Sequence, residues 1–485
     1  MVKQGIEQCK GDDEVSVKEG RAKYLAKNTF IFTLGNIGSK LISFFLLPLY
    51  TNCLTTGQYG TVDLITTIAT VAVPMITLDI GESLMRFGLD KNADRRQNTQ
   101  ISILILLCSF LATFVFSLLL SKFTSVGNYS FYIFFYMISF AACQVFLSDL
   151  RGKELLFHYS LASMLVTFFI AIFNILFLLV FHLGIKGYLM AYGVSNLLVA
   201  LYCLIIGKGY RSFGFSLITK KQLKEMVGYS FALIPNTFMW WITDSSDRIL
   251  VTSLIGAAAN GIYAVSYKLP TIVSSFASVF NQAWLYSAVR EKDSSDEFSY
   301  NNDILRVLTA WSIIVGLAVL AFTKLFLKFL VAAAYYEAWK YTPFLVIGVV
   351  YMTLGTFMGT SYSVHKDSVG FLISGMLGAI INIVLNLFLI RRIGVYGSAL
   401  ATCLSYVSVF IFRFFHTQKY LHYRLKSVEF ICGSLFLVMS SCFMFIDNYL
   451  GTLLQILVLL ITIILFSRDW LPFVKTIFRR LSNII

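Results

Sequence analysis

The 485-residue sequence contains few charged residues, and this scarcity excludes an ordinary soluble domain. Only 13% of its residues are Asp, Glu, Lys or Arg, whereas soluble domains contain about 25%. Hydrophobic residues make up 58% of the chain and the mean hydropathy is +0.76. Such a composition predicts an all-α polytopic membrane protein.

Histidine and cysteine are also too scattered for a catalytic or metal site. The five histidines form no HExxH or other metal-binding spacing, and the eight cysteines form no CxxC pair. No other catalytic constellation is present either. We therefore expect a protein that is not an enzyme and has no metal site or cofactor. Residues 1–27 lack the apolar core of a signal peptide.

Apolar segments with room for the ~20 residues of a membrane-spanning helix recur along the chain. We predict about fourteen transmembrane helices, at 28–51, 61–86, 99–121, 129–150, 156–181, 186–207, 225–247, 257–287, 303–327, 341–364, 368–390, 394–415, 428–446 and 449–467.

The basic residues predict the orientation of these helices. If the N-terminus is cytoplasmic, 28 of the 39 Lys and Arg residues lie in inner segments and only seven in outer loops. This asymmetry follows the positive-inside rule and predicts that both termini are cytoplasmic. The net charge of +14 is thus spread over short inner loops, which argues against nucleic-acid binding.

Two pairs of segments are similar to one another, which indicates an internal repeat. The loop and helix start at 54–68 align with 255–269, placing Gly60 over Gly261, and LGIKGYLMAY (183–192) aligns with IGVYGSALAT (393–402). Many transporters are built from such repeats. We predict two pseudo-symmetric six-helix lobes and two further helices. The predicted divisions are a cytoplasmic segment 1–27, lobes 28–207 and 225–415, a basic linker 208–224, a basic loop 416–427, helices 13 and 14 within 428–467, and a cytoplasmic tail 468–485.

Several motifs resemble those of bacterial polysaccharide repeat-unit flippases, within the multidrug, oligosaccharidyl-lipid and polysaccharide exporter superfamily. They are IGESLMRF (80–87), YSFALIPNTFMWWITDSSDR (229–248), NGIYAVSYKLP (260–270) and INIVLNLFLIRRIGVYGSALAT (381–402). The chain departs from the family pattern at Arg391-Arg392, where a proline is common. The resemblance implies that a lipid-linked oligosaccharide on undecaprenyl diphosphate is moved across the bacterial cytoplasmic membrane, by alternating access of the two lobes. It also implies partners in membrane lipids and other polysaccharide assembly proteins.

Cations within apolar segments are candidates for binding the diphosphate of such a cargo. A charge in hydrocarbon is costly, so an intramembrane lysine needs a partner or a hydrated cavity. Lys40 and Lys268 have no acid three or four residues away, and Lys268 precedes Pro270, which favours a kink. The resemblance implies that their helices line the cleft between the lobes. The alternative is that each lysine snorkels to an interface or pairs with an acid on another helix. Further candidates for diphosphate binding are Arg86, Arg248 and Arg306.

Acidic residues in the same segments are candidates for ion coupling. Glu82 and Arg86, and likewise Asp244 and Arg248, have the i, i+4 spacing of helical ion pairs. If these pairs neutralise each other, Asp79 and Asp247 remain as extra carboxylates. Each of the four acids could exchange H⁺ or bind Na⁺ in a poorly hydrated cavity.

Uncharged polar and aromatic side chains are candidates for sugar contacts. Amides in helices either bind sugar hydroxyls or join helices; those predicted to contact a glycan are Asn36, Asn236, Asn281 and Gln282. Trp and Tyr either stack on sugars or occupy the membrane interface; the aromatic residues considered are Trp240, Trp241, Tyr263, Tyr267 and Trp284.

Other functions are to be weighed against this one from the same sequence. A flippase for peptidoglycan or teichoic-acid precursors would use the same diphosphate handle. A cation-coupled multidrug exporter of the same superfamily would have a lumen dominated by acids and aromatics. A glycan polymerase or ligase would need a large outer loop, and no predicted outer loop is much longer than about a dozen residues.

Overall fold

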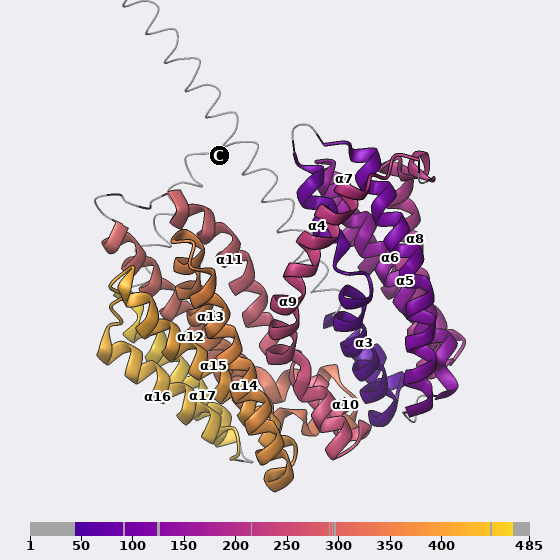
Figure 1. Ribbon diagram of the computed structural model, residues 1–485. Helices are drawn as coiled ribbons and strands as arrows, with labels where there is room; N and C mark the ends of the chain where they lie inside the picture. Colours follow the sequence, from indigo (N-terminus) through magenta and orange to yellow (C-terminus); the bar gives the residue numbers. More distant parts are fainter. Residues whose placement is uncertain are drawn as a thin grey trace, which may run out of the picture. The chain divides into compact units, whose positions relative to one another are not determined.

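The computed structural model describes residues 44–90, 93–123, 127–214, 216–290, 292, 294, 297–446 and 449–468. Within these residues every regular element is a helix (Figure 1). The α-helices are α2 (Leu47–Cys53), α3 (Thr56–Ile76), α4 (Ile80–Gly88), α5 (Arg95–Phe123), α6 (Ser130–Gly152), α7 (Leu156–Asn174), α8 (Gly184–Ile206), α9 (Lys220–Leu254), α10 (Ala257–Ser266), α11 (Pro270–Arg290), α12 (Glu297–Leu330), α13 (Thr342–Val364), α14 (Ser368–Ile393), α15 (Val395–His416), α16 (Ser427–Phe443) and α17 (Tyr449–Leu465).

Nine helical segments of the described ranges are long and apolar enough to cross a membrane. α16 and α17 are apolar but shorter. Lipid offers no water to bond the backbone N–H and C=O groups. Apolar segments of this length therefore fold as helices, in which these groups form hydrogen bonds with one another. The chain is therefore an all-helical, multi-pass membrane protein. The predicted total of fourteen crossings extends beyond the described residues, because the segment 28–51 is described only from residue 44 onward.

The described residues fall into two compact units. One contains Val73–Val180 and Lys186–Ala232, and the other contains Leu46–Ala72, Phe181–Ile185 and the chain from Leu233 onward. Three helices of the described residues pass from one unit to the other: α3 between Ala72 and Val73, α8 between Ile185 and Lys186, and α9 between Ala232 and Leu233.

Two predicted helices are interrupted, each near a proline. The segment 61–86 forms α3 and α4, joined by a turn in which Leu78 and Asp79 have positive φ. The segment 257–287 forms α10 and α11, and Pro270 is the first residue of α11. Proline is favourable at a helix start because its missing N–H would have no partner there. α9 begins at Lys220, within the segment predicted as a linker.

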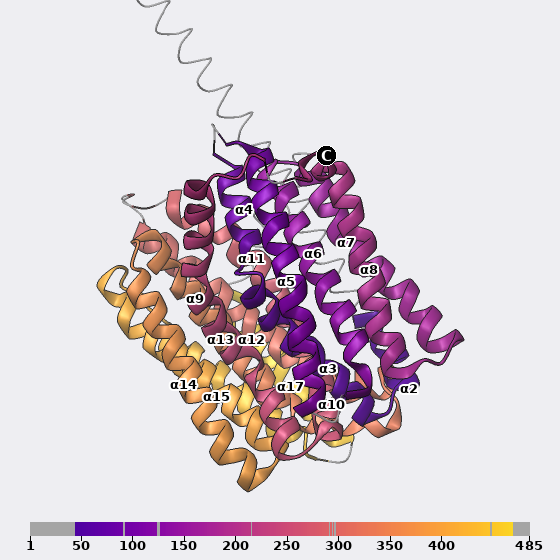
Figure 2. The same ribbon diagram turned by 45° about the vertical axis from the view of Figure 1, so that its right-hand side comes forward.

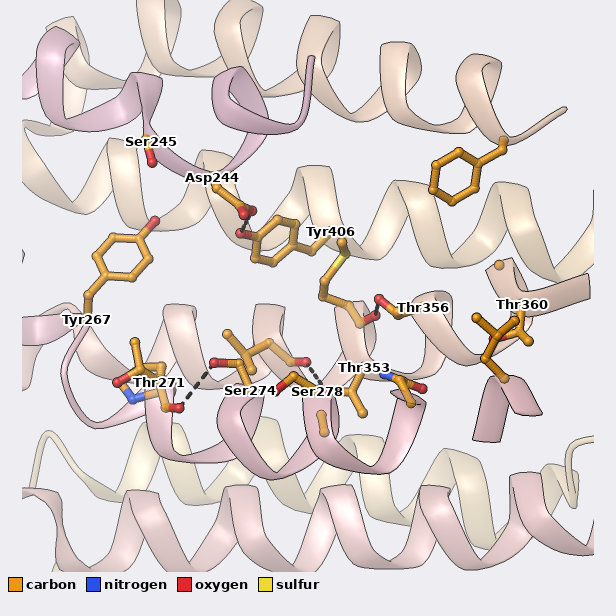
Figure 3. A pocket seen from close by; sticks show the side chains of 18 of the residues that line it. Asp244, Ser245, Tyr267, Thr271, Ser274, Ser278, Thr353, Thr356, Thr360 and Tyr406 are labelled. Carbon is orange, nitrogen blue, oxygen red and sulfur yellow. Dashed lines mark hydrogen bonds between the residues drawn. The ribbon is translucent and has the colours of Figure 1, made fainter. Parts of the chain in front are cut away.

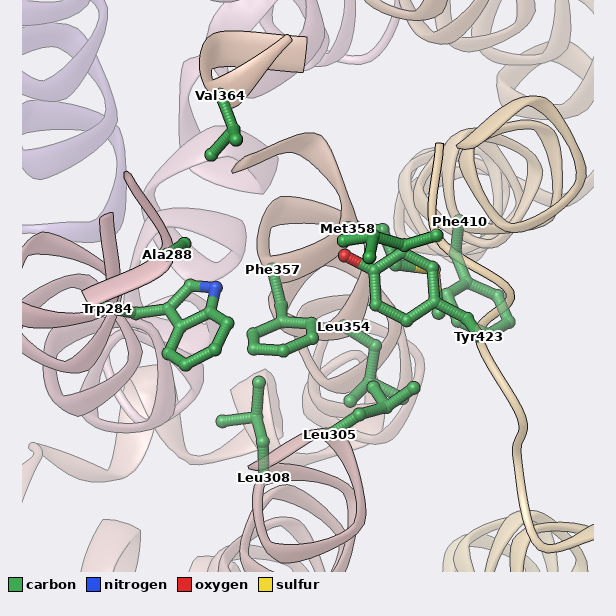
Figure 4. Close-up of a cluster of buried hydrophobic side chains, with 11 residues drawn as sticks. Trp284, Ala288, Leu305, Leu308, Leu354, Phe357, Met358, Val364, Phe410 and Tyr423 are labelled. Atoms are coloured by element: carbon green, nitrogen blue, oxygen red, sulfur yellow. The ribbon is translucent and has the colours of Figure 1, made fainter. Parts of the chain in front are cut away.

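The core of the second unit is aromatic and lies where α11, α12, α13 and α15 meet (Figure 4). Trp284 of α11 stacks on Phe357 of α13 with ring centroids 4.8 Å apart. Tyr423 packs edge-on against Phe357 from the chain after α15. Offset and edge-on aromatic contacts stabilise a core beyond their buried area. This cluster fixes α11 against α13, and both helices also line a cavity. In both ribbon views α14 and α15 run beside each other within the same unit (Figures 1 and 2).

The glycines aligned in the predicted repeat have matching structural roles. A Cβ on Gly60 would lie 1.8 Å from the carbonyl oxygen of Ala257, and a Cβ on Gly261 would lie 2.0 Å from that of Thr56. α3 and α10 therefore approach each other reciprocally, at a distance only glycine permits. The aligned Gly184 and Gly394 both have left-handed φ, 57° and 61°.

Candidate functional site

A cavity of about 650 Å³ lies inside the second unit (Figure 3). α9, α11 and α13 provide most of its wall, with Phe371 of α14 and Tyr406 of α15. Cavities of this size accommodate small ligands or part of a larger one. Its lining is rich in hydroxyl groups, as the labelled side chains in Figure 3 show.

Two helices present these polar groups with identical spacing. α11 contributes Thr271, Ser274, Ser278 and Asn281, and α13 contributes Thr353, Thr356, Thr360 and Ser363. Both sets have the spacing i, i+3, i+7 and i+10, which places them on one face of a helix. We call them the α11 row and the α13 row.

Hydroxyl groups of the two rows donate hydrogen bonds to carbonyl groups of their own helices. Their oxygen atoms can still accept hydrogen bonds from a ligand. Ser274 Oγ donates to the Thr271 carbonyl at 3.1 Å, and Thr356 Oγ1 donates to the Met352 carbonyl at 2.8 Å. The buried Asn281 Oδ1 has no hydrogen-bond partner within the described structure. A buried polar atom without a partner is costly, so a ligand that donates to Asn281 would be favoured.

Asp244 of α9 is the carboxylate that faces this cavity. Its Oδ1 accepts a hydrogen bond from the Tyr406 hydroxyl at 2.8 Å (Figure 3). The Asp244 side chain lies within the helix bundle. It is nevertheless exposed, because it borders the open cavity. The ion pair between Asp244 and Arg248 does not form; Asp244 accepts from Tyr406, and Arg248 pairs with an acid on another helix.

Arg248 also borders the cavity, but it pairs with an acid on another helix. Its Nη1 lies 3.0 Å from Asp63 Oδ1 of α3 and donates to Thr67 Oγ1 at 3.3 Å. Tyr267 stacks near the guanidinium, 5.1 Å from the ring centroid. Since Asp63 already neutralises Arg248, this arginine is a weaker candidate for binding diphosphate than its position alone suggests.

Asp247 is fully buried, 0% exposed, immediately behind the cavity wall. Its Oδ2 accepts from the hydroxyls of Tyr263 at 2.8 Å, Tyr267 at 2.5 Å and Thr402 at 3.2 Å. Its Oδ1 accepts from the Arg248 backbone N–H at 2.9 Å, so among the described residues Asp247 is held by neutral groups and no cationic side chain contacts it directly. Carboxylate and neutral oxygens are the ligands of hard cations, and a buried carboxylate held this way is also suited to proton exchange.

A buried amide network joins this carboxylate to α14 and α15. Asn382 donates to Thr402 at 3.3 Å and accepts from Ser246 at 3.2 Å. Asn386 donates to Asn382 at 2.9 Å and accepts from Ser398 at 2.8 Å. The network connects three helices, so a change at Asp247 reaches beyond its own helix.

Of the predicted cationic residues that the structure describes, Lys268 and Arg248 lie near each other and near Asp63, whereas Arg86 and Arg306 form separate pairs. Lys268 is half-buried in the turn between α10 and α11, does not line the cavity and has no direct acid partner within the described ranges. Arg306 of α12 pairs with Asp303 at 3.2 Å near the helix start. Arg86 pairs with Asp90, not with Glu82 as expected, and Glu82 pairs with Arg151 at 3.7 Å. Lys40 lies outside the described residues.

The remaining predicted residues have varied positions. Asp79 precedes α4 in the turn after α3, and Asn281 lines the cavity. Asn36 and the side chains of Asn236 and Gln282 lie outside the described part of the chain. Trp284 is in the core at 4% exposure, so it does not face the cavity.

Sequence reasoning missed three features of this region. Asp63 is a charge in an apolar segment and could have been found by the criterion that selected Asp247. The two hydroxyl rows could have been found by their shared spacing. Arg413 was not selected as a candidate site residue, although it is buried in α15.

The helix arrangement is similar to that of solved transporter structures. A solved structure described as lipid II flippase MurJ in an inward closed conformation superposes with a TM-score of 0.64 at 14% identity, covering 92% of this chain and 100% of that one. A transporter from Pyrococcus furiosus, described as a superfamily member whose binding pocket has reversed polarity, superposes with a TM-score of 0.56 at 13% identity, covering 81% and 94%. At these identities the likeness concerns the fold.

The family is shown by the sequence itself. The profile described as "Polysaccharide biosynthesis protein" matches residues 25–286, more than half of the chain, and the chain belongs to this family. An uncharacterized membrane protein of Methanocaldococcus jannaschii is 24% identical over 49% of this chain and 59% of its own length. A probable multidrug resistance protein of Bacillus subtilis is 28% identical over 41% of this chain and 46% of its own length. The matched part thus spans about half of these relatives.

Proposed function

We propose that the protein is a flippase that moves oligosaccharide repeat units, linked to undecaprenyl diphosphate, across the cytoplasmic membrane of a bacterium. The observation that carries this proposal is the cavity lined by the α11 and α13 rows. Sugars are polyols, and a wall of neutral hydroxyls and an amide offers them hydrogen bonds without a strong charge. The family membership points to the same cargo class.

Transport would proceed by alternating access of two six-helix lobes with both termini in the cytoplasm. The matched glycines of the repeat support this symmetric organisation. The polyprenyl tail can stay in lipid while the glycan passes through a hydrated path. Other assembly proteins of the polysaccharide would supply and consume the cargo.

Asp247 is the residue that we propose couples transport to an ion gradient. Its burial among Tyr263, Tyr267 and Thr402 suits a bound proton or Na⁺, because no cationic side chain of the described residues contacts this carboxylate. Since Asn382 bonds both Thr402 and Ser246, ion binding would also alter the packing of α9 against α14 and α15. Asp79, Glu82 and Asp244 are the alternative carboxylates.

A multidrug exporter driven by cation exchange is the second candidate. Asp244 supports it, because this carboxylate faces the cavity and could attract a cationic drug. The relative from Bacillus subtilis bears a name of this kind. The cavity wall nevertheless contains many hydroxyls against this single acid. The fold likeness also leaves flippases of peptidoglycan or teichoic-acid precursors as alternatives within the leading class.

Deletion of the gene, followed by analysis of lipid-linked sugars and surface glycan, separates these functions. We expect a lipid-linked intermediate to accumulate and the surface glycan to fall. Raised drug sensitivity without such an intermediate would favour the exporter instead. Accumulation of a peptidoglycan precursor would assign the other cargo.

Complementation of the deletion with Asp247→Asn tests the coupling residue. We expect gradient-dependent transport to fall at least about tenfold, since the amide cannot be charged and discharged. Asp303→Asn is the matched control, because Asp303 makes only an exposed pair with Arg306. Full gradient dependence in the Asp247 variant would remove this residue from the mechanism.

A further inference from the structure

Arg413 of α15 is a buried cation that has no acidic partner in the part of the chain that the structure describes. Its side chain is 1% exposed, and no carboxylate of the described structure lies within ion-pair distance of it. Asp367, at the start of α14, instead binds Lys419, Tyr420 and the Gly370 amide. A buried charge without a counter-charge is strongly unfavourable, so its retention calls for a function.

The hydrogen bonds of Arg413 are few and replaceable. Nε donates to Ser374 Oγ at 3.1 Å and Nη1 to the Gly355 carbonyl at 3.0 Å, while the buried Nη2 has no partner in the described residues. Ser374 also donates to the Phe371 carbonyl, and the Gly355 carbonyl lies within α13, where the helix supplies its own donor. Loss of Arg413 would therefore leave neither group without a partner.

The guanidinium lies directly behind the wall of the hydroxyl-lined cavity. A Cβ on Gly359 would come within 2.7 Å of Arg413 Nη1, so the guanidinium fills the space beside this glycine. Gly359 and Phe371 both line the cavity. The Phe371 ring also covers the guanidinium, with its centroid 5.3 Å from Cζ, and Trp240 lies at 5.5 Å.

We propose that Arg413 is a phosphate-binding residue of the cavity, screened by Phe371 in this conformation. A planar guanidinium with a free Nη2 can bind two oxygens of a phosphate, and such charge-assisted pairs are strong in a poorly hydrated site. This proposal rests on the function proposed above. It assigns the diphosphate of the cargo to Arg413 rather than to Lys268 or Arg248. The α11 and α13 rows would hold the attached sugars.

Binding measurements on the full-length protein in nanodiscs test this assignment. The probes are inorganic pyrophosphate and undecaprenyl diphosphate, and the variants are Arg413→Gln and Arg413→Lys. Arg391→Gln is the control, since it removes the same charge from an exposed position at the other end of the α14–α15 hairpin. We expect Arg413→Gln to weaken both probes at least about tenfold, Arg413→Lys to weaken them less, and the control to stay within about twofold.

Thermal unfolding of the same samples distinguishes binding from structure. A binding role predicts that Arg413→Gln folds and unfolds at the same or a higher temperature than the wild type, because an unpaired buried charge has been removed. Wild-type affinity in both Arg413 variants would overturn the proposal, and so would loss of the fold in Arg413→Gln, since arginine would then be structural.

The outcome also separates this proposal from the proposed function. If Arg413→Gln retains affinity while the wild type transports a lipid-linked glycan, only the role of Arg413 fails. If pyrophosphate binding depends on Arg413 but no glycan is transported, only the function fails. Failure of the wild type to bind either diphosphate overturns the role of Arg413, and transport of a cationic drug instead overturns the function as well.

Discussion

Gly359 and Arg413 occupy one small volume, which makes their coupling measurable. Gly359→Ala would place a methyl group 2.7 Å from Nη1 and force the guanidinium to move. We expect the free energy of unfolding to fall by about 1–3 kcal/mol, as in other overpacked sites. The same substitution in an Arg413→Gln background should cost clearly less, because the shorter side chain leaves room.

Gly375→Ala provides the matched control for this measurement. Gly375 is in α14, and outside its own helix backbone a Cβ there would meet no atom of the described residues within 4 Å. Thermal or denaturant unfolding of the four combinations gives the coupling energy directly. Equal costs of Gly359→Ala in both backgrounds would mean that the two residues do not share this space.

Asp367 predicts a pH dependence at the end of the bundle outside the membrane-spanning segments. Hydrogen bonds from the Tyr420 hydroxyl, the Gly370 N–H and the Lys419 ammonium lower the pKa of Asp367 below its ordinary value. A lowered pKa in the folded state stabilises the fold above the unfolded pKa of about 3.9, and this contribution is lost as the pH falls below that value.

The Asp367→Asn variant tests this pH dependence. We expect it to unfold at a lower temperature than the wild type at about pH 7, and the difference to shrink as the pH approaches about 3. Glu337→Gln is a control, because Glu337 makes an exposed pair with Lys340 away from this cluster. A difference between wild type and Asp367→Asn that stays constant with pH would contradict the assigned role of the carboxylate.

Features that follow from a residue's own chemistry were predictable from the sequence. Partners from distant segments of the chain were not. The cost of charge in hydrocarbon pointed to Asp247, and the missing N–H of Pro270 pointed to a helix break. The partner of Arg248 is 185 residues away, so i, i+4 spacing could not reveal it. The hydroxyl rows were missed because Ser and Thr can bond their own helix, and only tertiary packing determines whether they face a cavity.

At the scale of helices, the contact between α3 and α10 depends on two glycines. Gly60→Ala would bring a Cβ within 1.8 Å of the Ala257 carbonyl, and backbone atoms cannot yield as a flexible side chain can. We expect a loss of about 1–3 kcal/mol in stability together with slower transport, measured by thermal unfolding and by complementation of the gene deletion.

Gly57→Ala is the control on the same helix. It lies nearly one turn earlier on α3, where a Cβ would have no atom within 4 Å. We expect stability and transport close to those of the wild type. If Gly60→Ala behaved in the same way, the close approach of α3 and α10 would not be needed for either property.

At the scale of the whole molecule, α3 and α9, two of the three described helices that cross from one unit to the other, carry a proline close to the division. Pro74 is two residues beyond Ala72 in α3, and Pro235 is three residues beyond Ala232 in α9. A proline within a helix removes one hydrogen bond and favours a bend, so we expect α3 and α9 each to have a hinge at its proline.

Replacement of both prolines by alanine tests the hinge. We expect Pro74→Ala with Pro235→Ala to raise the unfolding temperature, since each interior proline costs a helix up to about 3 kcal/mol, and to slow transport. Pro343→Ala is the control, because Pro343 is at the start of α13, where proline is tolerated. Unchanged transport in the double variant would exclude these hinges.

The two hydroxyl rows also have an energetic consequence for movement. Successive turns of a helix are about 5.4 Å apart, so each row repeats similar groups at nearly regular steps. A polyol can then exchange one set of hydrogen bonds for the next without losing all of them at once. For the glycan cargo proposed above, we therefore expect a free-energy profile along the cavity with shallow wells rather than one deep minimum. A flippase with such a surface would be expected to favour rapid passage over tight retention and to depend little on the order of the sugars.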